Sequence, residues 1–152
     1  MKGGCLLRVK ELAIIYRTRL DLPAFDAYQS LATPRQAASF LIPILGQEAT
    51  EVFGIVCLST KHHFIAWHEV SRGSLDTTVV HPRDVFKAAL LVNAACILGT
   101  HNHPSGDPIP SPDDLELTRR LAAAGELMGI PLIDHLIIGD GRYYSFKEGG
   151  RL

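Results

Sequence analysis

The chain has 152 residues, of which 47% are hydrophobic and 20% are charged, values that favour one globular domain with a single core. Its formal net charge is −1 and its sequence pI is about 6.6. These values argue against a chain-wide phosphate-binding surface, because such surfaces need a basic excess. The sequence has no secretory signal and no apolar stretch of about 18 residues, so we expect a cytoplasmic protein that does not enter membranes.

Three cysteines occur, an odd number without close spacing, which fits neither a disulfide framework nor a cysteine-based zinc site. Cys57 and Cys96 lie inside apolar runs and are predicted to be small buried hydrophobes. Near the N-terminus, basic residues outnumber Glu11, and a solvated face is favoured there over a nucleic-acid contact. These basic residues are Arg8, Lys10, Arg17 and Arg19.

Residues 1–33 are predicted to form an N-terminal arm or extension, and residues 34–152 the main domain. Thr33 followed by Pro34 is a helix-start signal, because the hydroxyl caps the helix and proline suits its first position. We expect this helix to end or kink at Pro43, since proline lacks a backbone N–H.

A β-hairpin is expected next, because residues 51–59 are an apolar, β-branched run and residues 64–73 follow after a polar turn. Residues 82–94 are predicted to form a helix that begins at its proline. One face of that helix is apolar. That face consists of Val85, Ala88, Ala89 and Val92.

The last part of the chain favours a strand, a helix and a final pair of strands. The strand is residues 95–100, the helix runs from Pro112 to Met128, and the pair is 131–139 with 142–148. This order predicts a mixed α/β (α+β) domain in which helices cover a small sheet.

The segment that carries the chemistry is residues 100–114, THNHPSGDPIPSPDD. In an extended backbone His101 and His103 point the same way and Asn102 points opposite. Two imidazoles on one face can reach one ion, and three protein ligands plus water describe a catalytic zinc site.

A third ligand is expected from Asp114, which the proline-rich turn returns toward the histidines. The alternative is that Asp114 only completes a helix start, since Ser111 is a suitable N-cap and an acid three residues later forms a capping box. Spacing and charge leave the two interpretations about equal.

A general base that is not a ligand is also needed. Glu51 is predicted for this role because it immediately precedes a buried strand, with Glu48 as its near rival. Without further information, a solvent-exposed acid at a strand edge is the favoured interpretation of both residues.

Other histidines are weaker candidates. His62 and His63 fit a polar hairpin turn, and His81 fits the start of a helix. Asp134 and His135 are predicted to be a satisfied polar pair near the core, with a supporting role at the metal as the alternative. The paired-cysteine arm of zinc deaminases and the helical HExxH of zincins are both absent from the sequence.

The same residues resemble the JAMM (MPN-plus) pattern of a distant Glu, H-x-H, seven residues, Ser, two residues and Asp. In this sequence the pattern falls on Glu51, His101, His103, Ser111 and Asp114. The wider text, from about residue 34 to the C-terminus, is similar to the RadC-type branch.

This resemblance implies a JAB/MPN-like (cytidine-deaminase-like) curved mixed sheet flanked by helices, with one zinc ion per chain. It implies that His101, His103 and Asp114 bind the metal. By the same resemblance Glu51 handles the proton of the attacking water, and Ser111 hydrogen-bonds the developing oxyanion.

The leading hypothesis is therefore a zinc-dependent hydrolase of peptide or isopeptide bonds with a peptide or protein substrate. The rival is a DNA-associated accessory protein of the RadC-like repair or mobile-element kind, whose metal site is structural or acts on nucleic acid. RadC-like proteins often carry an N-terminal helix-hairpin-helix region, and residues 1–33 show no such pattern, which weakens the rival.

Overall fold

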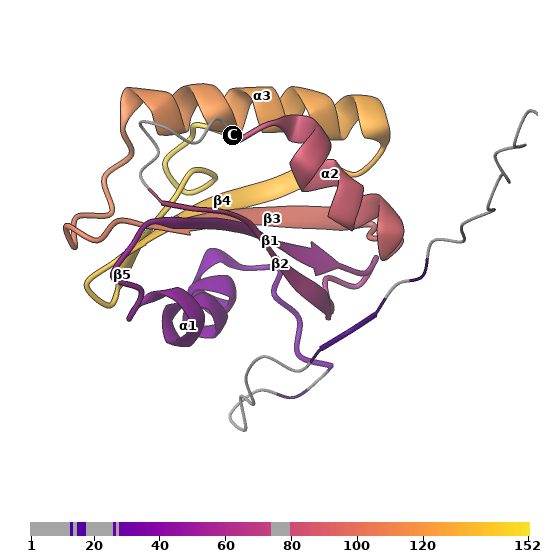
Figure 1. Ribbon diagram of the computed structural model, residues 1–152, viewed down its shortest axis with the longest axis horizontal. Coiled ribbons are helices and arrows are strands. Elements are labelled where there is room, and N and C mark those ends of the chain that lie inside the picture. Colours follow the sequence, from indigo (N-terminus) through magenta and orange to yellow (C-terminus); the bar gives the residue numbers. More distant parts are fainter. Residues whose placement is uncertain (1–12, 14, 18–25, 27, 74–79) are drawn as a thin grey trace, which may run out of the picture.

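A computed structural model describes residues 13, 15–17, 26, 28–73 and 80–152 of the protein. It contains three helices and five strands within these residues (Figure 1). In chain order they are α1 (Pro34–Leu45), β1 (Val52–Leu58), β2 (Phe64–Arg72), α2 (Pro82–Leu91), β3 (Cys96–Asn102), α3 (Pro112–Met128), β4 (Leu132–Gly139) and β5 (Arg142–Ser145).

The strands form one mixed sheet in the order β2-β1-β3-β4-β5. Only β3 and β4 run parallel, and the other neighbours are antiparallel. The parallel pair is joined by α3, because a parallel connection needs a crossover and a short turn cannot make it. The predicted β1–β2 hairpin and the final β4–β5 pair are both confirmed.

Helices cover both faces of the sheet, with α2 and α3 on one side and α1 on the other (Figure 1). Alternate residues of β1 enter different cores, which explains why the whole strand is apolar and buried. Val52 and Val56 pack with the α1 side, whereas Phe53 and Ile55 pack with the α2 and α3 side. The mixed α/β class with flanking helices is confirmed, but the sheet divides the expected single core into two.

The helix boundaries follow the sequence signals with two differences. Thr33 caps α1 in a capping box as expected, but the helix continues past Pro43 to Leu45. Helix α2 stops at Leu91, earlier than predicted, because Asn93 adopts a positive φ of 53° that is incompatible with a continuing right-handed helix.

Much of the expected N-terminal arm lies outside the described residues, as do Cys5, Arg8, Lys10, Glu11 and Arg19. Arg17 is described and exposed. The boundary between an arm and a domain at residue 33 therefore stays a prediction. Among the described helices, none has the length and apolar character required to cross a membrane.

Candidate metal centre

The centre lies where β3 ends and the chain enters the proline-rich loop. His101 is within β3 and fully buried, and His103 follows the strand and is half-buried. Their Nε2 atoms lie 3.0 Å apart. The strand alternation thus brings both imidazoles to one point, as predicted.

Asp114 reaches this point from the first turn of α3. Its Oδ1 lies 3.1 Å from Nε2 of His101, and its Oδ2 lies 3.4 Å from Nε2 of His103. Only 1% of its surface is exposed. The backbone N–H of Ser111 donates to the same Oδ2 at 2.7 Å, and Ser111 and Asp114 form a full capping box. The capping interpretation of Asp114 is confirmed, and the same carboxylate faces the two histidines. Its role as a metal ligand stays a prediction.

Glu51 approaches from the neighbouring strand, because β1 pairs with β3 and sets Phe53 opposite His101. Oε1 of Glu51 lies 3.9 Å from Nε2 of His101. One ligand atom from each of Glu51, His101 and His103 can be chosen so that all three lie within 4.8 Å of one another, so this group can bind a metal ion. Glu48, the predicted rival, instead forms an ion pair with Arg72 at 2.6 Å.

Asn102 holds the Glu51 segment in place, a role that the sequence analysis missed. Its buried side-chain oxygen accepts a hydrogen bond from the backbone N–H of Val52 at 2.8 Å. Its amide donates to the carbonyls of Glu48 and Thr50 at 3.2 and 3.1 Å. The expected outward direction of Asn102 was the available signal, since a polar side chain pointing away from the histidines needs partners elsewhere.

Asp114 and His103 shift each other's pKa. Burial alone would raise the pKa of Asp114, but hydrogen bonds with His101 and His103 outweigh it and hold that pKa well below its usual range. The hydrogen bond with Asp114 raises the pKa of His103, against the opposing effect of burial and with help from the Asp107 carbonyl. Asp114 therefore favours the protonated, positively charged form of His103.

The donor set fits a bound cation. Nδ1 of His103 lies 2.7 Å from the carbonyl oxygen of Asp107, which can only accept, so Nδ1 carries the proton and Nε2 offers its lone pair in the neutral ring. When the His101 ring is neutral with its lone pair on Nε2, the buried Oδ1 of Asp114 has no hydrogen-bond donor among the described residues. Imidazole nitrogen and carboxylate oxygen are the ligand types that zinc accepts.

Ser111 lies beside the centre at the N-cap of α3. Its hydroxyl donates to Oδ2 of Asp114 at 2.8 Å and accepts from the backbone N–H of Asp114 at 3.1 Å. Oδ2 has a second donor in the backbone N–H of Ser111. The hydroxyl proton is therefore available for another acceptor without leaving this oxygen unsatisfied.

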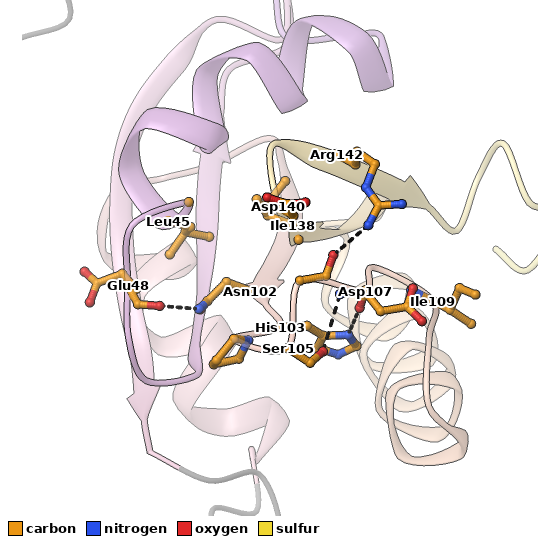
Figure 2. Close-up of a pocket in the computed structure, with 14 residues that line it drawn as sticks. Leu45, Glu48, Asn102, His103, Ser105, Asp107, Ile109, Ile138, Asp140 and Arg142 are labelled. Atoms are coloured by element: carbon orange, nitrogen blue, oxygen red, sulfur yellow. Dashed lines mark hydrogen bonds between the residues drawn. The ribbon is translucent and has the colours of Figure 1, made fainter.

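A pocket of about 700 Å³ borders His103 (Figure 2). Its wall includes the acidic residues Glu48, Asp107 and Asp140, and Arg142, which donates to the carbonyl of Gly106 at 3.0 Å. The last contact ties the loop after His103 to β5. The pocket offers space for a bound molecule next to the centre.

The other histidines named in the sequence lie in a turn or at a helix start. His62 lies in the β1–β2 turn with a positive φ of 58°, and the His63 ring makes an edge contact with Tyr28, so the turn interpretation holds. His81 is the N-cap residue of α2 but its side chain makes no capping hydrogen bond.

Asp134 and His135 have different surroundings. Asp134 is a satisfied buried carboxylate that accepts from Ser145, Lys147 and the backbone of His135. Burial raises its pKa despite these bonds. His135 lies directly behind His101, with its Nε2 2.9 Å from Nδ1 of His101, and burial holds its pKa well below the ordinary value.

Comparison with known proteins identifies the family. The family model described as RadC-like JAB domain matches residues 31–151. The chain belongs to the RadC-like JAB domain family. This family has the fold of JAMM-type metal-dependent hydrolases, and the resemblance seen in the sequence is confirmed.

Curated relatives of this RadC-like chain carry the name UPF0758 protein, which states no activity. The relative from Clostridium beijerinckii is 39% identical over 150 residues, covering 99% of this chain and 66% of the relative. Those from Caldanaerobacter subterraneus and Alkaliphilus oremlandii are 47% and 45% identical, covering 87% and 97% of this chain and 57% and 65% of the relatives. The chain thus spans 57–66% of the length of these relatives.

Proposed function

We propose that this RadC-like protein is a zinc-dependent hydrolase that cleaves an amide bond in a peptide or an isopeptide-linked protein. The observation that supports it most is the meeting of His101, His103 and Asp114 around one point, with a further carboxylate 3.9 Å from His101. Three ligands and a separate acid are what a catalytic zinc site requires.

Zinc held by His101, His103 and Asp114 would supply Lewis acidity, polarising a carbonyl and lowering the pKa of water to about 7. Glu51 accepts the proton of the attacking water and returns it to the leaving amine, so that no proton is lost overall. The Ser111 hydroxyl turns from Asp114 to donate to the oxygen of the tetrahedral intermediate. Asn102 keeps Glu51 within reach by holding the backbone of Val52.

The substrate chain is proposed to lie in the pocket beside His103. At about 700 Å³ the pocket has room for several residues, and its wall carries the exposed carboxylates of Asp107 and Asp140 beside the Arg142 guanidinium. Such a wall can hydrogen-bond an extended peptide backbone and favours substrates with basic side chains.

The test is zinc content and turnover in three variants. We expect about one zinc per chain in the unmodified protein, and loss of zinc in His101→Ala and Asp114→Ala. Glu51→Gln should keep the zinc and lower peptide hydrolysis by at least about 100-fold, since general base catalysis contributes on the order of 100 to 10,000-fold. Elemental analysis and hydrolysis of a peptide library measure both properties.

Absence of zinc from the unmodified protein after supplementation would refute this function. Zinc binding without any amide hydrolysis, together with salt-dependent retention on DNA, would instead support the DNA-associated accessory role.

A further inference from the structure

A chain of buried polar groups extends behind His101, on the side away from the centre. Nδ1 of His101 lies 2.9 Å from Nε2 of His135, and Nδ1 of His135 lies 2.6 Å from Oγ1 of Thr118. The Thr118 hydroxyl in turn donates to the backbone carbonyl of Asp114 at 2.6 Å. All three side chains are at most 1% exposed, so water does not compete for these contacts.

Only one arrangement of protons satisfies this chain. The Asp114 carbonyl cannot donate, so the single hydroxyl hydrogen of Thr118 points to it and its oxygen accepts from His135. His135 therefore carries its proton on Nδ1, and in the neutral ring Nε2 is an acceptor. His101 must then donate from Nδ1, which leaves the lone pair of its own Nε2 facing Asp114 and His103.

The ring of His135 is held in the orientation that this order requires. It stacks on Phe146 with centroids 4.7 Å apart and planes 10° from parallel, and it meets Phe53 edge-on at 5.7 Å. Its backbone N–H donates to Asp134 at 2.7 Å, and its carbonyl accepts from Phe146 at 3.0 Å. A half-turn of the ring would put carbon atoms where its nitrogens are and would lose the contacts with His101 and Thr118.

We propose that Thr118 and His135 are positioning residues that hold His101 in the tautomer able to bind the metal through Nε2. This inference rests on the metal site of the proposed function. Ligand histidines usually donate their second N–H to a carboxylate, a carbonyl or water. Here a neutral imidazole takes that place, and its own proton is directed by a hydroxyl on α3.

Helix α3 thereby acts on both sides of His101. Asp114 lies in front of the imidazole, and Thr118, one turn further along the helix, directs the proton behind it. His101 lies on β3 and His135 on β4, the two parallel strands that α3 connects. The same helix thus supplies the Asp114 carboxylate and the Thr118 hydroxyl that directs the proton of His135.

Two substitutions of Thr118 test the inference in the full chain. Thr118→Val has the same shape without the hydroxyl, and Thr118→Ser keeps the hydroxyl and serves as the matched control. Zinc affinity is measured by competition with a chelator. The tautomer of His135 is read from its ring ¹⁵N shifts after zinc removal.

We expect Thr118→Val to bind zinc 10- to 100-fold more weakly, the usual loss when a group supporting a ligand is removed. Its His135 should change from the Nδ1–H form to a mixture of tautomers. Thr118→Ser should match the unmodified protein in both measurements. Unchanged affinity in Thr118→Val, an unchanged tautomer, or equal losses in both variants would overturn the inference.

These readouts are separate from turnover. A protein that binds zinc and shows the expected Thr118 effects but hydrolyses no amide would refute the proposed function and support this inference. If hydrolysis depends on Glu51 but Thr118→Val binds zinc as tightly as the unmodified protein, the proposed function is supported and this inference is refuted. Failure of the unmodified protein to bind zinc would remove both.

Discussion

The carboxylate of Asp114 caps helix α3 and also faces His101. Its Oδ2 accepts from the backbone and hydroxyl of Ser111, which fixes the start of α3, while Oδ1 faces His101. A carboxamide keeps an oxygen for the first task but loses the charge that the second requires. The two tasks can therefore be separated by substitution.

We expect Asp114→Asn and Asp114→Ala to lose zinc equally but to differ in stability. Alanine removes half of the capping box and should cost about 1 kcal/mol of unfolding free energy. Asparagine keeps an acceptor for Ser111 and should cost less than half of that. Urea unfolding of the metal-free proteins gives the comparison, and zinc retained by Asp114→Asn would contradict the assigned ligand.

The raised pKa of His103 predicts how zinc binding depends on pH. Asp114 stabilises the protonated His103 ring in the folded protein. The contribution of this contact to folding stability is fully present below the unfolded pKa of about 6.5 and is lost as pH rises through the higher folded pKa of His103. Zinc must displace that proton. Zinc affinity should therefore rise by about tenfold per pH unit up to the folded pKa of His103.

Isothermal titration at several pH values, corrected for buffer ionisation, would measure the proton released. An affinity that is constant between mildly acidic and neutral pH would contradict this dependence.

At the level of elements, the loop between α1 and β1 depends on Asn102. Its three hydrogen bonds hold the carbonyls of Glu48 and Thr50 and the N–H of Val52, the residue directly after Glu51. The buried N–H of Val52 would have no partner if the side chain were removed. Position of the proposed base is therefore controlled from β3.

Asn102→Ala should lower the unfolding free energy by about 1–3 kcal/mol, the cost of leaving a buried backbone group unsatisfied. Turnover should fall more than zinc affinity, because Glu51 moves while the histidines remain. Thr50→Ala, at an exposed position of the same loop, is the control and should change stability by less than about 0.5 kcal/mol. Equal losses of zinc and turnover would show that Asn102 supports β3 instead.

The elements with strong local signals were predictable from the sequence. The Thr-Pro and Ser-Pro starts located α1 and α3, because capping depends on a few neighbouring residues. The alternation of β3 predicted the shared direction of His101 and His103. The sequence left a supporting role for His135 open and indicated the direction of Asn102, but it did not identify Thr118 or the partners of these residues. Each of these partners lies at least 17 positions away, and its place depends on strand pairing.

At the scale of the whole molecule, two cores sandwich the central sheet, and Cys57 of β1 lies in the one beneath α2 and α3. Burial, with a smaller contribution from Cys96, raises the pKa of the Cys57 thiol to about 12. Both cysteines are free and buried, which confirms their predicted role as small hydrophobes.

Cys57 should therefore resist alkylation by iodoacetamide near pH 8 as long as the sheet stays closed. The thiolate is the reactive form, and in this core it forms only when the protein opens. Mass spectrometry of the Cys57 peptide follows the reaction, with the same protein in denaturant as the control. Labelling at the denatured rate would contradict the two-sided burial of β1.

The crossover from β3 through α3 to β4 gathers the proposed metal ligands into one continuous piece of chain, from His101 to Asp114, while Glu51 directly precedes β1. Under the proposed function, metal binding and proton transfer therefore depend on two separate segments of the chain. Substitution of Glu51 alone would then leave a metal-binding protein without hydrolysis, with its fold and ion intact. A glutamate at this position would be a better sign of hydrolytic activity than the two histidines.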